Sequence, residues 1–363
     1  MKVTLINPKL IINKKDKFTT GIVYMPIGLA YVNAFLKKNN IETSVIDLFS
    51  NGINKITSKK KFLEIGDDIE NYIKNFDSKT LFFVYANQII NHDYILHIIK
   101  LIKKNFNNNY LGVIQNSQAV TAYSLEKVKK IFFDNNVDIL LISNPERAIF
   151  EIVNKIKKKE NLENINNTIT PLKKSYQKNF KENLDKIFFP DWEGFKIENY
   201  WKLGHAHGPL SSKKYLPILT SRGCPYPCKF CVVPQTSSRI WIGRSPKNIV
   251  DEIVFFQDKY QIEEFHLEDL NPTVNEGRTI KFCNELIKRN IKIKWKIVSG
   301  TKVESIKKLS TLKLMAKSGC KYISISPESG STKVMKMIDK PFDIDHAKLL
   351  IKQMNMLGIK SQA

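Results

Sequence analysis

Long apolar runs are missing from this sequence, and cysteine is scarce. No stretch approaches the ~20 apolar residues of a transmembrane helix, and residues 1–8 lack the apolar core of a signal peptide. The five cysteines are too few, and odd in number, for the disulfide framework of a secreted protein. We therefore expect a cytoplasmic protein that does not associate with a membrane.

Acidic residues are outnumbered, with 35 Asp and Glu against 58 Lys and Arg, for a net charge of +23. Such an excess can indicate a nucleic-acid partner. Here, however, lysine is spread along the whole chain, and runs such as 59–61 and 157–159 are typical of solvated helix ends and loops. Nucleic acid is therefore the less favoured partner. The 42% hydrophobic and 26% charged residues indicate a globular protein, and 363 residues favour two domains.

Short apolar segments alternate with helical patterns over residues 1–156. In the segment 26–38, Leu29, Val32 and Leu36 recur at helical spacing. Buried parallel strands covered by helices on both faces produce this alternation. We predict a flavodoxin- or Rossmann-like doubly wound α/β domain, with strands at 3–6, 44–48, 81–85, 111–114 and 138–142 and a helix over 146–156.

A second strand–helix series occupies residues 215–363, after an interval (157–214) whose Asn and Lys content predicts a linker. Ser245 and Pro246 suit the N-cap and first turn of a helix, and Gly319 suits a helix end. The series predicts a partial βα barrel, with strands at 216–220, 265–268, 293–297, 322–325 and from 359 onward, separated by helices.

Three of the cysteines are clustered with C-x3-C-x2-C spacing, in the segment Cys224-Pro225-Tyr226-Pro227-Cys228-Lys229-Phe230-Cys231. The two prolines keep the loop from becoming helical, which helps three thiolates to converge. The loop follows a predicted strand, and in a βα barrel the ends of the strands form the face that carries active sites. Three thiolates would leave one iron of a [4Fe–4S] cluster without a protein ligand.

Two further features of the cysteine and histidine content bear on this site. Structural zinc is an alternative, with His205 or His207 as the fourth ligand, although zinc ligands usually pair as C-x2-C knuckles. The isolated Cys283 and Cys320 lie on predicted helices or their ends, where ordinary buried thiols are expected.

The segment from Thr220 to Cys231, with Phe230 just before the third cysteine, resembles the signature of the radical SAM superfamily. The amino-terminal domain is similar to the start of the cobalamin-binding domain that is joined to many radical SAM proteins. The resemblance covers nearly the whole chain and continues in Pro26–Tyr31, Ile41–Leu48, Pro190–Trp192, Arg244–Ile253, Leu267–Asn271, Ser318–Lys321 and Ile325–Ser331.

The resemblance implies a radical SAM enzyme. Cys224, Cys228 and Cys231 would bind three irons of a [4Fe–4S] cluster, and S-adenosylmethionine (SAM) would chelate the fourth. An electron, supplied by a donor such as flavodoxin or ferredoxin, would cleave SAM to methionine and a 5′-deoxyadenosyl radical, which would abstract hydrogen from a small-molecule substrate. The amino-terminal domain would add cobalamin and, with it, methyl transfer or a similar reaction.

The same resemblance implies roles around SAM. Backbone near Phe230 would hold the adenine, and Asp269 or Glu268 would accept hydrogen bonds from the ammonium group. Each of these two acids is equally a candidate for capping a strand end. Ser326 and Glu328 leave a strand where the ribose and methionine should lie.

Two features depart from the family pattern. The Asp-x-His-x-x-Gly motif of cobalamin domains, whose histidine ligates cobalt, is absent. His92 is followed by Asp93, so the order and spacing of the two residues differ from the motif, and we expect His92 at a loop or helix start. Cobalamin would thus bind without that ligand. In addition, roughly four of six strand–helix units precede Ala363, so we expect a fragment or an incomplete barrel.

Arg244 is expected to pair with a carboxylate or to lie at the surface.

Two alternative functions remain at this point. The positive charge suggests a tRNA-modifying radical SAM enzyme, and the early stop suggests an inactive truncated module that binds a cluster or cobalamin without turnover. The substrate is not readable, because residues of the barrel interior would select it.

Overall fold

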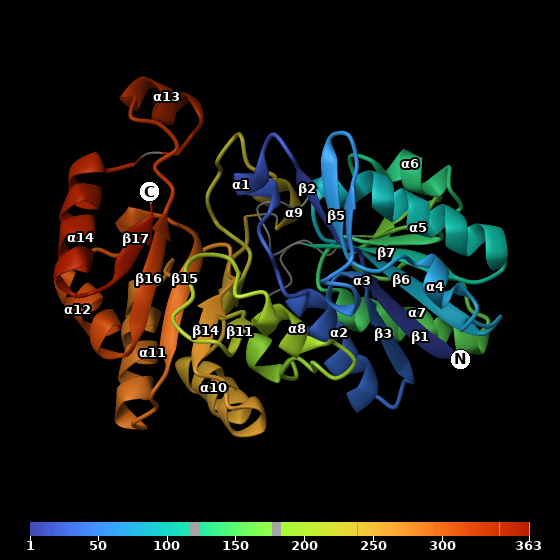
Figure 1. Cartoon of the computed structure of the whole chain (residues 1–363), viewed down its shortest axis with the longest axis horizontal. Coiled ribbons are helices and arrows are strands. Elements are labelled where there is room, and N and C mark those ends of the chain that lie inside the picture. The colour runs from blue at the N-terminus through green and yellow to red at the C-terminus, as the bar shows by residue number, and fades with distance from the viewer. Residues whose placement is uncertain (117–122, 176–182, 238, 341, 363) are drawn as a thin grey trace. The chain divides into compact units, whose positions relative to one another are not determined.

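The computed structural model describes residues 1–116, 123–175, 183–237, 239–340 and 342–362. It divides into two compact units, residues 1–180 with 187–203 and residues 181–186 with 204–363 (Figure 1). In the described part of the chain, no helix is long and apolar enough to cross a membrane.

The first unit is built on a mainly parallel sheet with the strand order β10-β9-β8-β7-β6-β1-β3. The strands β3, β1, β6, β7 and β8 are parallel, and their order is the flavodoxin-like 2-1-3-4-5 order. The predicted doubly wound sheet is therefore confirmed. Its strands are β1 (Lys2–Asn7), β3 (Thr43–Asp47), β6 (Thr80–Ala86), β7 (Leu111–Gln115), β8 (Ile139–Leu141), β9 (Thr168–Ile169) and β10 (Lys174–Ser175).

Helices cover both faces of this sheet because the apolar side chains of its strands alternate between the faces. Phe82 and Val84 of β6 pack with Ile95 and Ile99 of α5 in one buried cluster. On the other face, α2 and α7 contact each other. The helices of the unit are α1 (Lys17–Thr20), α2 (Ile27–Lys38), α3 (Leu48–Asn51), α4 (Glu70–Ile73), η1 (Ile89–Asn91), α5 (His92–Asn105), α6 (Lys129–Phe133), α7 (Pro145–Lys158) and α8 (Ile197–Lys202).

Two parts of the first unit differ from the sequence prediction. A small antiparallel sheet of β2 (Leu10–Asn13), β5 (Phe62–Ile65) and β4 (Ile56–Ser58) was not expected. The interval 157–214, expected to be a linker, is divided between the units, and β9 pairs with β8. Buried Ile165 and Ile169 explain this pairing, since burial of their side chains fixes the segment against the sheet.

The second unit contains five parallel strands in the order β11-β14-β15-β16-β17. Each neighbouring pair is joined through helices, and right-handed crossovers between adjacent strands place all these helices on one face. Accordingly, α10 contacts α11, α11 contacts α12, and α12 contacts α14 (Figure 1). These strands are β11 (Tyr215–Ile218), β14 (Glu264–Leu267), β15 (Lys294–Thr301), β16 (Cys320–Ile325) and β17 (Lys360–Gln362).

The helices of the second unit begin and end largely where the sequence predicts. The Ser245 side chain caps α10 by accepting from the Asn248 N–H, with Pro246 in the first turn. Gly319 follows α12 with φ of +102°. The remaining elements are η2 (Leu184–Lys186), β12 (Ser221–Arg222), α9 (Val233–Thr236), β13 (Ile242–Gly243), α10 (Pro246–Tyr260), α11 (Glu276–Lys288), η3 (Val303–Ser305), α12 (Leu309–Lys317), α13 (Thr332–Met337) and α14 (Ile344–Met356).

Candidate functional site

The cysteine loop, residues 223–232, follows β11 and the short strand β12 in the second unit. Gly223 begins it with φ of +78°, and a Cβ at this position would overlap the carbonyl oxygen of Ile240. Both the positive φ and this close approach require glycine. The Cys231 N–H donates to the Cys228 carbonyl at 3.2 Å, and the Ser237 hydroxyl donates to the Cys224 carbonyl at 3.4 Å. The loop therefore has a defined course that is not helical.

All three thiols of the loop are half-buried. Burial, with smaller contributions from the neighbouring Cys228 and Cys231, raises the pKa of Cys224 to about 11. Burial also raises the pKa of Cys231, with a smaller contribution from Cys228. Three half-buried thiols on one loop suit a metal centre, because a metal binds cysteine as the thiolate and stabilises that form.

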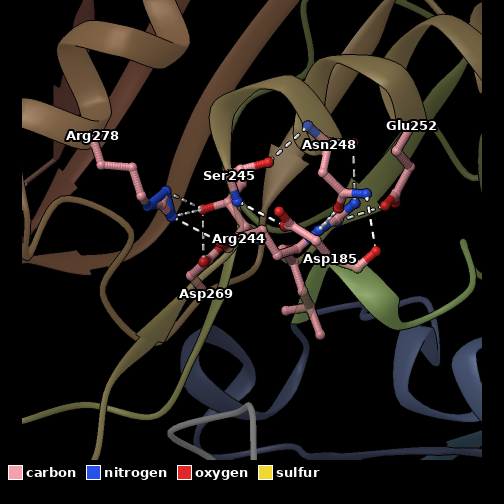
Figure 2. Close-up of polar contacts among 9 residues, drawn as sticks. Asp185, Arg244, Ser245, Asn248, Glu252, Asp269 and Arg278 are labelled. Atoms are coloured by element: carbon pink, nitrogen blue, oxygen red, sulfur yellow. Dashed lines mark hydrogen bonds and ion pairs between the residues drawn. The ribbon is translucent and has the colours of Figure 1, made fainter. Parts of the chain in front are cut away.

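Thr220, just before the loop, lies at the centre of a polar network that we call the Thr220 cluster (Thr220, Ser221, Asp269 and Arg278). Its N–H and hydroxyl donate to the Asp269 carboxylate at 3.0 and 2.8 Å, and the Ser221 hydroxyl donates to the same carboxylate. Arg278 of α11 donates to the carbonyl and to the hydroxyl of Thr220, both at 2.8 Å. Figure 2 shows Asp269 and Arg278 converging on this strand end.

Asp269 is fully buried, and burial raises the pKa of its carboxyl group. Both of its oxygens accept hydrogen bonds from the residues that precede the cysteine loop. Of the two roles considered for Asp269, the geometry favours the strand-end cap, because its carboxylate is enclosed by Thr220 and Ser221. Its neighbour Glu268 lies instead with an oxygen 3.8 Å from His207 Nδ1.

Arg244 makes a further set of polar contacts near the end of β11. Its guanidinium forms an ion pair with Glu252 of α10 at 2.6 Å, and both side chains are at most 5% exposed. It also donates to the Leu219 carbonyl at 2.9 Å and to the Asn248 side chain at 2.7 Å. Figure 2 shows Asp185 beside it, accepting from the Ser245 N–H at 2.8 Å. Of the two expectations for Arg244, pairing with a carboxylate is confirmed.

Three of the residues predicted to contact SAM gather around a lysine that the sequence did not single out. The Lys340 ammonium donates to the Ser326 carbonyl at 2.8 Å and to Glu328 Oε1 at 2.5 Å. It also lies 5.8 Å from the centre of the Phe230 ring, which is 54% exposed. The structure thus brings Phe230, Ser326 and Glu328 to one place, apart from the enclosed Asp269.

A second lysine faces the same loop from another element. The Lys302 ammonium, just after β15, lies 4.6 Å from the centre of the Tyr226 ring, within the range of a cation–π contact. Tyr226 is the central residue between Cys224 and Cys228. Neither Lys340 nor Lys302 belongs to a short motif, so only proximity in the fold reveals them.

A buried charged group lies on the polar face of the second sheet. Glu264 of β14 contacts His266 at 2.9 Å and Lys296 of β15 at 3.1 Å, and all three side chains are 1% exposed. Tyr215 of β11 stacks on the His266 ring at 4.5 Å. Burial lowers the pKa of His266 to about 4, and the Lys296 charge contributes. His266 is therefore neutral at physiological pH, beside a Glu–Lys ion pair.

Among the described residues, no group of three or more His, Cys, Asp or Glu side chains is arranged to hold a single metal ion. In an iron–sulfur cluster, by contrast, each thiolate binds a different iron and the sulfurs need not share one point. Three half-buried thiols on one loop fit such a cluster. The isolated Cys283 and Cys320 are buried, as predicted.

In the first unit, the carboxyl ends of β1 and β6 mark the switch point of the sheet, where ligands bind in folds of this kind. Among the described residues, the side-chain oxygens of Asn7 and Asn91 are buried here without a hydrogen-bond partner. Asn7 donates to Asp47 at 2.7 Å, and burial raises the pKa of Asp47. His92 begins α5, as predicted, with Nδ1 3.3 Å from the Tyr123 hydroxyl.

Comparisons with known proteins agree with this picture. Residues 218–362 match the model of the radical SAM superfamily, so this part of the chain is a radical SAM domain. The chain is 26% identical, over 99% of its length and 71% of the relative's, to cytidylyl-2-hydroxyethylphosphonate methyltransferase of Streptomyces wedmorensis. It is 31% identical, over 50% of its length and 31% of the relative's, to anaerobic magnesium-protoporphyrin IX monomethyl ester cyclase of Rubrivivax gelatinosus.

Solved structures resemble both units together. The radical SAM methyltransferase TsrM of Kitasatospora setae matches 99% of this chain and 66% of its own, with a TM-score of 0.74 and 14% identity. The cobalamin-dependent enzyme OxsB, solved with aqua-cobalamin, matches 99% of this chain and 48% of its own, with a TM-score of 0.72 and 19% identity. The chain thus spans about half the length of OxsB. The predicted radical SAM domain and fold class are confirmed, as is the expectation of an enzyme.

Proposed function

We propose that this protein is a cobalamin-dependent radical SAM methyltransferase acting on a small molecule. The observation that carries the proposal is the C-x3-C-x2-C loop at the end of β11, in a chain whose two units match TsrM over 99% of their length. The similarity to the Streptomyces wedmorensis methyltransferase over 99% of the chain supports methyl transfer as the reaction.

Cys224, Cys228 and Cys231 would hold three irons of a [4Fe–4S] cluster. Such a cluster, when bound, supplies an open iron that chelates SAM and the electron that cleaves it. The exposed ring of Phe230 offers an apolar surface for the adenine. Oxygens of Ser326 and Glu328 would accept hydrogen bonds from polar groups of SAM. A flavodoxin or ferredoxin would supply the electron.

Asp269 would act as a positioning residue for the same site. Its carboxylate fixes Thr220 and Ser221, only a few residues before Cys224. A loop that must hold three thiolates at fixed positions requires a rigid first segment, because small displacements of the ligands weaken binding of the cluster. This role is independent of any direct contact between Asp269 and SAM.

Cobalamin would bind at the switch point of the first unit. The unpartnered oxygens of Asn7 and Asn91 could accept hydrogen bonds there from amide side chains of the corrin. No Asp-x-His-x-x-Gly motif supplies a histidine to cobalt, so the proposal is binding without a protein histidine. Retention of hydroxocobalamin through gel filtration, followed by its visible spectrum, tests this part.

The cluster is tested by anaerobic purification and reconstitution. We expect a brown protein with about four irons per chain and release of 5′-deoxyadenosine after addition of dithionite and SAM. Cys228→Ala should lose most of the iron and all of this product. Cys283→Ala is the matched control, since Cys283 is buried on α11 outside the loop and should leave both unchanged.

Several outcomes would contradict the proposal. Colourless protein with one zinc would indicate a structural metal site instead. Bound iron without any cleavage of SAM would indicate an inactive module. For methyl transfer itself, cytidylyl-2-hydroxyethylphosphonate is the first substrate to test, because it appears in the name of the relative from Streptomyces wedmorensis.

A tRNA substrate is the second candidate. Two observations favour it, the net charge of +23 and 27% identity over 173 residues to tRNA-2-methylthio-N(6)-dimethylallyladenosine synthase of Treponema denticola. That match covers 44% of this chain, against 99% for the small-molecule methyltransferase. Affinity for tRNA that falls steeply with salt would support this candidate, and no measurable affinity would exclude it.

A further inference from the structure

The connection between β16 and α14 is tied together by Lys340. Its side chain is only 10% exposed, so its ammonium needs compensation for lost hydration. The Ser326 carbonyl and the Glu328 carboxylate supply it, at 2.8 and 2.5 Å. Both acceptors lie at the start of this connection, so the Lys340 ammonium joins the end of the segment 326–340 to its beginning.

Glu328, which pairs with Lys340, has an unusual backbone conformation. Its φ is +63°, in the left-handed region that non-glycine residues seldom adopt. Such a conformation costs roughly 1 kcal/mol or more and persists only where surrounding contacts hold it. The ion pair with Lys340 is the contact that fixes the direction of the Glu328 carboxylate.

The end of the same segment reaches the cysteine loop. The Ile338 carbonyl accepts from the Lys229 N–H at 3.0 Å, and the Lys340 ammonium lies 5.8 Å from the centre of the Phe230 ring. Lys229 and Phe230 are the two residues between Cys228 and Cys231.

We propose that Lys340 is a positioning residue that couples the cysteine loop to Glu328, and that its charge makes the bound cluster easier to reduce. The inference rests on the proposed function, since it requires a cluster on the three cysteines. A reduced cluster carries one more negative charge than an oxidised one. A fixed cation attracts that charge more strongly in a half-buried site than it would at the same distance in bulk water.

The test compares three variants of the full chain after anaerobic reconstitution, without SAM. Lys340→Met removes the charge and the polar contacts with Ser326 and Glu328, and Lys340→Arg keeps the charge. Lys336→Met is the control, because Lys336 is exposed on the neighbouring helix α13. The readouts are iron per chain and the ratio of reduced to oxidised cluster during a redox titration followed by electron paramagnetic resonance.

We expect Lys340→Met to lower the ratio of reduced to oxidised cluster about threefold to tenfold at a fixed potential; a tenfold change equals about 59 mV for one electron. Lys340→Arg and Lys336→Met should match the wild type. Glu328→Gln should shift the ratio in the opposite direction, because it removes a negative charge beside Lys340, which lies near Phe230 of the loop.

Equal ratios of reduced to oxidised cluster in Lys340→Met and Lys336→Met would overturn the inference. A ratio in Lys340→Arg as low as that in Lys340→Met would also overturn it. If Lys340→Met no longer retains iron, Lys340→Arg decides: normal iron and potential support the role of the charge, and loss in both variants contradicts it. Absence of iron from the wild type would instead refute the proposed function, so the two failures are distinguishable.

Discussion

Thr220→Val is the substitution that most directly tests how the cysteine loop is supported. Valine has nearly the shape of threonine but no hydroxyl, so it removes polar contacts without opening a large cavity. The lost contacts are the hydrogen bond to Asp269 and that from Arg278, both at 2.8 Å. The backbone groups of Thr220 keep their bonds to the same two partners.

The expected cost follows from the charge of these partners. A hydrogen bond to an ionised group contributes about 1.5–3 kcal/mol, and the two share one hydroxyl and are not additive. We therefore expect Thr220→Val to destabilise the β11–β12 region by about 3 kcal/mol. Thr220→Ser keeps the hydroxyl and loses one buried methyl group, which costs about 1 kcal/mol.

Native-state hydrogen exchange measured by mass spectrometry is the appropriate assay. A chain of two units need not unfold in one step, whereas exchange reports the local free energy of opening. Amides of residues 216–222 should open about thirtyfold more often in Thr220→Val than in Thr220→Ser, the equivalent of about 2 kcal/mol. Equal protection in the two variants would refute the claim that the hydroxyl supports the strand end.

Two further predictions concern the second unit. Gly223→Ala should lower the melting temperature and the iron content after reconstitution, because alanine tolerates neither the φ of +78° nor the approach of the Ile240 carbonyl; Gly330→Ala, with open space at its Cβ, should change neither. The pKa of His266 is about 4 in the folded chain, against 6.5 when unfolded. Between these two pH values the unfolded chain therefore binds more protons than the folded chain. The free energy of unfolding should fall as the pH drops from 6.5 to 4, by about 3 kcal/mol in total. Denaturant titrations should show this loss in the wild type and a flatter profile in His266→Gln, and parallel profiles would contradict the prediction.

Helices and strands with strong local signals were predictable from the sequence. The helix expected over 146–156 lies within α7, and all five strands of each parallel series form. The sheet of β2, β4 and β5 was missed because its strands have only three or four residues and largely lack buried side chains. Strands of this kind depend on pairing with distant segments, so no periodicity reveals them.

The sequence by itself determined the cluster of three cysteines at the candidate site and the class of the fold. Three cysteines on one short loop and alternating apolar runs are local features, and the structure places them as the pattern predicts. Only the tertiary structure decided which polar residues support the loop. Asp269 is enclosed against Thr220, 49 residues away in sequence, and Lys340 joins Glu328 to the loop. The energies of such buried charges depend on partners and burial that only the folded chain creates.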